Sequence, residues 1–355
     1  MRQSLDHRTP AGLRGHQRGS AGRRLVPVAA ALASVAMVAA ACGGVAAAKK
    51  SGGATTTTAA PTGGSTTTTA AGSSTTASAG SSTTAAGSGS GGSLVPAKVA
   101  AVAALVPKSI ASKGTLTFAE DATYPPDEFV SSSGKVVGMD ADLAKALAGV
   151  MGLKPVVKNV TFNAIIPGLQ AARYDVGLSS FTDTKKREKV VTFVTYFKAG
   201  EAFYVKASGG PSISGLSSLC GKKVAVESGT TEEADAKTQS AACTKNGKPA
   251  VTVQVYQNQN EANLAVSSGR ADLGFLDSQV AAYVVKQSNG AFKLSGQAFK
   301  VAPYGIAVPK SSGLAKPMLA AVKALMTDGT YNKILAKWGT QNGAISNPVI
   351  NGATS

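Results

Sequence analysis

The chain has 355 residues, with 36 Lys and Arg against 19 Asp and Glu, and its formal net charge is +17. Its two histidines, His7 and His16, lie near the N-terminus. Because the rest of the chain has no histidine, a Ser-His-Asp or Cys-His catalytic set is excluded there, and a zinc or haem site is improbable. Residues 1–41 contribute +5 of the charge, and the remaining Lys residues are scattered with few aromatic residues between them. We expect no nucleic-acid partner, no metal and no cofactor.

Residues 1–41 have the pattern of a secretory signal, in which arginines precede a short apolar stretch over 25–41. The run Ala39-Ala40-Ala41-Cys42 resembles a bacterial lipobox, whose cysteine is diacylated and becomes the mature N-terminus. Cleavage by ordinary signal peptidase, which leaves Cys42 lost or free, is the alternative. We expect an exported protein held at the outer face of the cell membrane through a lipid on Cys42.

Residues 49–93 consist almost entirely of Ser, Thr, Gly and Ala. This composition has too little apolar bulk to offset the entropy cost of ordering, so it predicts a flexible segment. Residues 94–110 are rich in Ala and Val and read as a transition into the fold. We therefore divide the N-terminal part into a signal peptide over 1–41 and a lipid-anchored, disordered tether over 42–110.

From about residue 113 onward, strand-like and helix-like runs alternate. Apolar runs predict strands at 116–119, 155–157, 223–226, 251–256 and 272–276. Helices are predicted at 140–148, at 165–172 with an opening near Pro167, just after 229–233, at 261–268 and at 278–287. The alternation indicates an α/β architecture with largely parallel sheets, and about 235 residues suit two modest lobes.

Beyond Cys42 the chain has two cysteines, Cys220 and Cys243, which are 23 residues apart. Outside the cytoplasm such a pair most simply forms a disulfide. A loop of this size contributes about 3 kcal/mol of stability in the chain-entropy model.

Hydroxyl side chains alternate along residues 178–187, which follow an extended-looking run. In an extended chain Ser180, Thr182 and Thr184 lie on one face, with Arg187 just beyond. A guanidinium with neighbouring hydroxyls suits a carboxylate, because the planar fork donates two charge-assisted hydrogen bonds. The alternative is a polar surface loop.

The folded part resembles family 3 extracellular solute-binding proteins, the polar amino-acid receptors of ABC importers. The matching runs occur in order at 121–126, 134–143, 165–170, 174–176, 189–193, 221–226, 268–272, 303–308 and 328–331, and end at Trp338. The resemblance implies a two-lobed periplasmic-binding-protein-like fold with two hinge strands and a ligand cleft between the lobes. It implies that ligand binding shifts the population to a closed form that the importer reads.

The resemblance also suggests domain boundaries. The first lobe is expected over 111–205 with a return over 302–342, the second lobe over 206–301, and a C-terminal tail over 343–355. The two chain crossings are placed near 203–206 and 299–302.

Arg187 matches the arginine that binds the ligand carboxylate in this family, and Asp277 matches the acceptor for the ligand α-ammonium. Simple capping of the helix that follows is the alternative role for Asp277. Ser179, Ser180 and Thr182 match the polar neighbours of the arginine.

Thr230 and Thr231 match a second carboxylate site, since backbone N–H groups are free where a strand runs into a helix. Helix capping is a compatible role for Thr230. Asp121 and Tyr124 match positions that line the side-chain pocket. Phe162 matches an aromatic residue that stacks on the ligand, with core packing as its alternative role.

Two acids depart from the family pattern. Glu120 stands where a small residue is common, and Asp127 stands where an aromatic residue is usual. We expect both to add negative charge near the mouth of the pocket, which favours a basic or polar amino acid over glutamate or aspartate. Asp183 is expected to point away from the hydroxyl face.

We expect an extracytoplasmic substrate-binding protein of an ABC importer, a monomer and not an enzyme, that delivers a polar amino acid to a membrane permease. One alternative is a cyclohexadienyl or prephenate-type dehydratase on the same fold, with Glu120 or Glu227 as proton donor. The other is the ligand-sensing subunit of a signalling system.

Overall fold

The structure is a computed structural model, and it describes residues 94–354. The predicted signal, the lipobox with Cys42 and most of the predicted tether fall outside the described residues. Within 94–354, every helix is too short or too polar to cross a bilayer.

The first lobe is built on parallel strands around β1 (Thr115–Glu120). This strand pairs with β5 (Lys154–Asn159) on one side and β6 (Val176–Gly177) on the other. A separate antiparallel sheet contains β2 (Thr123–Tyr124), β3 (Glu128–Val130) and β4 (Val136–Val137). The helices are α1 (Ala100–Ala103), α2 (Lys108–Lys113), α3 (Met139–Met151), α4 (Phe162–Gln170), α5 (Lys185–Glu188), α9 (Ala315–Thr327) and α10 (Thr330–Trp338).

Helix α4 differs from its prediction, because it begins at Phe162 and contains Pro167 in its interior. The reason is a cap from elsewhere in the chain: the backbone N–H of Phe162 donates to Asp121 Oδ2 at 2.8 Å. This bond satisfies one of the free N–H groups of the first turn, so the helix starts earlier than the local sequence indicates.

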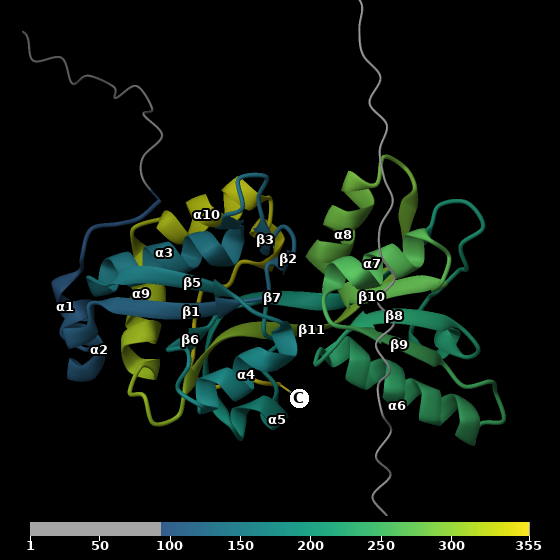
Figure 1. The fold of residues 1–355 in the computed structure, drawn as a ribbon, viewed down its shortest axis with the longest axis horizontal. Coiled ribbons are helices and arrows are strands. Elements are labelled where there is room, and N and C mark those ends of the chain that lie inside the picture. Colours follow the sequence, from purple (N-terminus) through teal and green to yellow (C-terminus); the bar gives the residue numbers. More distant parts are fainter. Residues whose placement is uncertain (1–93, 355) are drawn as a thin grey trace, which may run out of the picture. The chain divides into compact units, whose positions relative to one another are not determined.

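The second lobe repeats the parallel pattern. Strand β8 (Lys223–Glu227) pairs with β9 (Thr252–Tyr256) and with β10 (Leu273–Asp277). The helical elements are η1 (Leu216–Leu219), α6 (Thr231–Lys245), α7 (Gln259–Ser267) and α8 (Ser278–Gln287), which lie beside these strands in Figure 1. Cys220 and Cys243 form a disulfide, as predicted, and it ties the end of η1 to α6.

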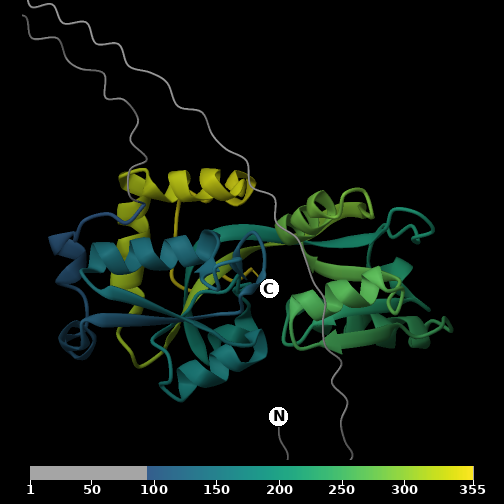
Figure 2. The ribbon, with the colours of Figure 1, turned by 45° about the horizontal axis from the view of Figure 1, so that its top comes forward.

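Two long antiparallel strands, β7 (Val191–Lys206) and β11 (Phe292–Pro309), join the lobes (Figures 1 and 2). They occupy the middle of an eight-stranded sheet with the order β5-β1-β6-β11-β7-β10-β8-β9. Their pairing shifts register near residues 295–305. The predicted two-lobed α/β architecture is confirmed, with parallel strands flanking this antiparallel centre.

The hydrophobic cores show where the lobes meet. Along β7, Ala199 belongs to the main core of the first lobe, whereas Ala202 belongs to a core of the second. Phe203, Tyr204 and Val205 are at most 1% exposed and pack with second-lobe strands. The change from one hydrophobic core to the other along β7 therefore lies between residues 199 and 202.

The C-terminal residues pack on the first lobe. Trp338 is half-buried against the first-lobe core, and its indole N–H donates to Asp142 at 3.0 Å. After η2 (Gln341–Gly343), the backbone N–H of Thr195 donates to the Val349 carbonyl at 2.9 Å. The N–H of Gly352 donates to the carboxylate of Asp183 at 2.7 Å.

Candidate functional site

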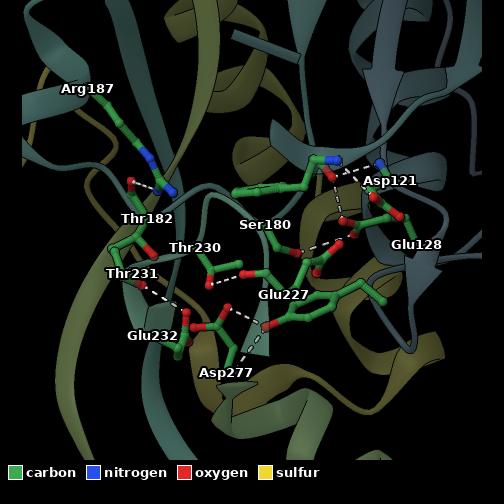
Figure 3. A pocket seen from close by; sticks show the side chains of 13 residues that line it. Asp121, Glu128, Ser180, Thr182, Arg187, Glu227, Thr230, Thr231, Glu232 and Asp277 are labelled. Carbon is green, nitrogen blue, oxygen red and sulfur yellow. Dashed lines mark hydrogen bonds between the residues drawn. The ribbon is translucent and has the colours of Figure 1, made fainter. Parts of the chain in front are cut away.

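A pocket between the two lobes contains all ten residues predicted to contact a ligand (Figure 3). Seven come from the first lobe and three from the second, and they are Asp121, Tyr124, Phe162, Ser179, Ser180, Thr182, Arg187, Thr230, Thr231 and Asp277. The pocket is also lined by three acids that were not among the predicted contacts, Glu128, Glu227 and Glu232. The fold thus brings together side chains separated by more than 150 positions in the sequence.

Arg187 is half-buried at one end of the pocket. Its Nη1 donates to the Thr182 carbonyl at 2.7 Å, and its Nη2 donates to the Gly229 carbonyl of the second lobe at 3.0 Å. The guanidinium carbon lies 5.4 Å from the ring centre of Phe162 and 5.3 Å from that of Phe181. Two of the five N–H donors are used in these bonds, and the rest are available to a carboxylate.

The hydroxyl side chains do not alternate along an extended strand, and that prediction is wrong. Strand β6 ends at Gly177, and Ser180 has a φ of 48°, which is a left-handed conformation. Thr184 caps α5, where its hydroxyl accepts from the N–H of Arg187 at 3.2 Å. Turn geometry, and not strand alternation, directs Ser180 into the pocket.

The hydroxyls of Ser179 and Ser180 are held by buried acids. Ser179 Oγ accepts from the N–H of Asp121 at 2.9 Å and donates to Glu128 Oε1 at 2.8 Å. Ser180 Oγ donates to Asp127 Oδ2 at 2.9 Å and lies 3.2 Å from Glu128 Oε2. Both serines line the pocket, and their hydroxyl groups are already hydrogen-bonded to buried carboxyl groups.

Asp277 occupies the N-cap position of α8, but its side chain makes no capping bond. Instead, Oδ2 accepts from the hydroxyl of Tyr124 at 2.9 Å, and the same hydroxyl accepts from the N–H of Asp277 at 3.0 Å. These bonds cross from the first lobe to the second. The carboxylate of Asp277 is therefore turned into the pocket, and capping is not its role.

Thr230 caps α6, where its hydroxyl accepts from the N–H of Glu233 at 3.2 Å. Thr231 Oγ1 donates to Glu232 Oε2 at 3.1 Å. The start of α6, with the positive end of its dipole, therefore lies at the pocket.

Phe162 belongs to a hydrophobic core and also lines the pocket. Its ring stacks on Phe181 at 4.4 Å between centroids, within a small first-lobe core, and it is 9% exposed. It also lines the pocket beside Arg187.

The two acids that depart from the family pattern are fully buried and do not line the pocket, so their expected place near the pocket mouth is wrong. Glu120 is fully buried, and neither carboxyl oxygen has a partner among residues 94–354. Asp127 is fully buried and accepts from Gln279 Nε2 at 2.7 Å. With Glu128 and Asp140 they form a buried acid cluster, in which Asp140 accepts from the N–H of Ser180 at 2.8 Å. Both are core groups behind the pocket wall.

Asp183 lies outside the pocket lining, as predicted. It is buried, and it anchors the C-terminal tail through Gly352.

Positions in the fold explain why three acids that line the pocket were not predicted as ligand contacts. Glu227 ends β8, at the edge of the sheet where the carboxyl end of β10 also places Asp277. Glu232 is in the first turn of α6, and Glu128 begins β3. The rule that sites form at the carboxyl ends of parallel strands could have found Glu227, whereas no local pattern marks Glu128 or Glu232.

The pocket lining contains five carboxyl groups and one guanidinium. Burial raises the pKa of Asp277 to about 7, and burial together with nearby Asp277 raises the pKa of Glu232 to about 8. Burial also raises the pKa of Glu227 well above its ordinary value, and the contacting Asp121 carboxyl adds to this shift. Without a cation, these carboxyls retain protons near neutral pH.

Further contacts hold the two lobes together beside the pocket. Asn163 Nδ2 donates to Ser228 Oγ at 3.0 Å, and the N–H of Gln259 donates to Thr123 Oγ1 at 3.2 Å. Gly229 has a φ of 85°, and a Cβ there would lie 3.0 Å from the Cβ of Asn163. Glycine therefore permits the close approach of the loop before α6 to α4. These contacts describe a closed arrangement around the pocket.

Across residues 94–354, no cluster of three or more His, Cys, Asp or Glu side chains has the arrangement of a metal site. The acids that line the pocket come from both lobes.

The chain is similar to several known proteins. It is 34% identical over 259 residues to the arginine-binding protein ArgT of Corynebacterium glutamicum, a match that covers 73% of this chain and 85% of the relative. The structure of an ancestral arginine-binding protein bound to arginine matches with 41% identity and a TM-score of 0.59, covering 63% of this chain and 98% of that one.

The structure of the ancestral amino acid-binding protein AncCDT-1, a precursor of cyclohexadienyl dehydratase, matches with 35% identity and a TM-score of 0.59. This match covers 65% of the chain and 97% of that structure. The family model of the bacterial extracellular solute-binding proteins, family 3, matches residues 116–341. On this match, which spans both lobes and the pocket between them, the chain belongs to the bacterial extracellular solute-binding proteins, family 3.

Proposed function

We propose that the protein is the substrate-binding component of an ABC importer and that its ligand is a basic L-amino acid, with arginine as the first candidate. The observation that carries this proposal is the lining of the pocket, which contains five carboxyl groups and one guanidinium. The similarity to proteins named for arginine binding supports it.

The ligand α-carboxylate binds Arg187, whose remaining N–H donors are directed by the bonds to the Thr182 and Gly229 carbonyls. The Thr182 hydroxyl, which has no partner among the described residues, is available to the same carboxylate. The start of α6, with Thr230 and Thr231, also lies at this end of the site and favours an anion. The two carbonyls that Arg187 contacts belong to different lobes, so the ligand carboxylate binds an arginine that already bridges the lobes.

The ligand α-ammonium binds Asp277, whose carboxylate is held in place by Tyr124. The cationic side chain extends to Asp121 and Glu227, which come from opposite lobes and contact each other. A cation between these carboxyls replaces a shared proton with a favourable charge pair. Phe162 provides an aromatic wall beside the ligand.

Ligand contacts with both lobes exist only in the closed arrangement, so binding favours closure, and the permease recognises the closed form. We further propose that the protein is exported, is anchored to the outer face of the membrane through Cys42 and acts as a monomer. In this proposal, residues 42–93 are the tether between the lipid anchor and the lobes.

A dehydratase activity is the second candidate, and Glu227 is the observation in its favour. Glu227 is 3% exposed, one of its oxygens has no partner among residues 94–354, and burial raises its pKa, as a proton donor requires. We favour binding over catalysis because a carboxyl partner, Asp121, accounts for this shift together with burial. Dehydration of prephenate by the purified protein, abolished by Glu227→Gln, would establish the enzyme instead.

Calorimetry of the purified protein with the twenty amino acids tests the proposed ligand. We expect arginine or lysine to bind, and Arg187→Ala to weaken that binding by at least about 100-fold, because the carboxylate loses its charged partner. Arg173→Ala is the matched control, since Arg173 is exposed, lies in the same lobe and is outside the pocket. Undiminished binding by Arg187→Ala overturns the carboxylate assignment, and binding of glutamate but of no basic amino acid overturns the proposed ligand class.

A further inference from the structure

A second concave site lies where the two long strands pass between the lobes. Its volume is about 510 Å³, within the range of small-molecule sites. Its floor is β7 from Phe197 to Gly200, one wall is α8, and the other wall is formed by Trp338 and the residues that follow α10. We call this site the hinge pocket. Both lobes contribute to it, and it shares no lining residue with the amino-acid pocket.

The charge of the hinge pocket is opposite to that of the amino-acid pocket. Its lining includes Lys198 and Lys286 and no Asp or Glu. Both lysines are exposed, and neither has an ion-pair partner anywhere in residues 94–354. An amino acid would find no acceptor here for its ammonium group, whereas an anion would find two ammonium groups without a counterion.

Aromatic rings from both lobes line the hinge pocket. Tyr283 of the second lobe and Trp338 of the first lobe line it, and both contact Phe129, at 6.5 and 5.7 Å between ring centroids. Val301 is 61% exposed at its edge. An apolar body on the ligand would therefore cover ring and aliphatic surface that water now contacts.

Gln279 connects the hinge pocket to the ligand-binding side of the protein. Its side chain lines the hinge pocket, while its Nε2 donates to Asp127 Oδ2 at 2.7 Å and to the Tyr304 hydroxyl at 2.8 Å. Tyr304 in turn lies close to Asp277. The Oε1 of Gln279 is buried and has no partner among the described residues. An occupant of the hinge pocket therefore lies one side chain away from the groups that hold Asp277.

We propose that the hinge pocket is a second binding site, for a small organic anion with an aromatic or apolar body and a carboxylate or similar group. The anion pairs with Lys198 and Lys286, and its body lies between Tyr283 and Trp338. Because the walls belong to different lobes, an occupant contacts both lobes at once. It therefore binds best to one lobe arrangement and couples to any ligand that favours the same arrangement.

Trp338 is the single tryptophan of the chain, so its fluorescence reports directly on this site. We would titrate the purified protein with benzoate at low ionic strength and follow the tryptophan emission. A saturable change is expected, and Lys198→Ala/Lys286→Ala should weaken the apparent affinity by at least about fivefold, because the carboxylate loses both cations. Lys316→Ala/Lys323→Ala, which removes two exposed lysines of α9 outside the pocket, should leave the affinity within about twofold.

Benzamide is the uncharged probe of the same shape, and we expect no saturable response to it. A linear change with benzoate, an equal response to benzamide, or an unchanged affinity in Lys198→Ala/Lys286→Ala overturns the proposal. The proposal goes beyond the amino-acid site, and these titrations contain no amino acid, so their result is independent of the proposed function.

Discussion

Asp121 and Glu227 face each other from opposite lobes, and this contact brings two carboxyl groups together at the pocket. Asp121 is fixed by three bonds: its oxygens accept from the Thr123 hydroxyl at 2.7 Å and the Phe162 N–H at 2.8 Å, and its own N–H donates to Ser179. Glu227 has no such support, since one of its oxygens is without a partner in the described chain. Glu227 is therefore the carboxyl that is free to meet a cation.

The Glu227→Gln variant tests this role. We expect arginine affinity to fall by about 30- to 100-fold, because a buried charge pair is lost, and glutamine affinity to change by less than about fivefold, because its amide needs no counterion. Isothermal titration calorimetry with both amino acids measures the ratio. Glu261→Gln, an exposed acid of the same lobe, is the control. Equal losses for both ligands would mean that Glu227 supports the pocket wall and does not select the side chain.

At the scale of elements, helix α6 lines the pocket at its N-terminal end and carries the disulfide near its C-terminal end. Its first turn faces the pocket through Thr231 and Glu232, with Thr230 as its cap. Toward its C-terminal end, Cys243 is buried and bonded to Cys220 after η1. The helix is mostly polar, and Ala236 and Cys243 are its buried apolar side chains. With so little apolar surface to bury, α6 depends on the disulfide for its attachment to the second lobe.

The Cys220→Ser/Cys243→Ser variant tests that dependence. Removal of the bridge is expected to cost about 3 kcal/mol and to lower the midpoint of thermal unfolding by roughly 10 °C. The measurement is thermal unfolding followed by circular dichroism, with and without a reductant. The reductant should lower the midpoint of the parent protein and leave that of the variant unchanged. An unchanged midpoint in the variant would show that α6 is held by its other contacts alone.

At the scale of the whole molecule, buried acids dominate the response to pH. Burial, with nearby Asp140, raises the pKa of Asp127 to about 7, and burial raises the pKa of Asp140 to about 6 and that of Asp277 to about 7. A carboxyl whose pKa is higher in the folded state binds more protons there, so its contribution to stability is present at low pH and is lost as pH rises through the folded-state pKa. The pKa values of Asp142 and Glu233 are lowered instead. These acids change their protonation below about pH 4, so they do not oppose the loss of stability at higher pH.

The ligand-free protein should therefore be more stable at pH 5 than at pH 8, with an unfolding midpoint higher by roughly 5 °C. Differential scanning calorimetry at constant ionic strength measures the difference. Asp127→Asn, which keeps the shape and an acceptor for Gln279 but cannot ionise, should reduce the difference. A midpoint that is constant or that rises between pH 5 and pH 8 would show that these carboxyls are ionised in the folded protein.

The sequence by itself determined the main alternation of strands and helices, the two-lobed α/β class, the disulfide and ten of the thirteen residues that line the pocket. These follow from local causes: apolar runs of strand length, helix-start residues, a single cysteine pair beyond Cys42, and motifs that resemble those of the family. Arg187 and Asp277 could be identified in this way because each is fixed relative to the strand or helix that carries it.

Only the tertiary structure decided which acids face a ligand and which face the core. Glu120 and Asp127 lie next to pocket residues in the sequence yet are buried behind the wall, whereas Glu227 and Glu232 reach the pocket from the other lobe. The left-handed turn at Ser180 and the contact between Asp121 and Glu227 likewise depend on partners far away in the chain. A side chain's environment is set by the elements packed against it, and local sequence does not contain that information.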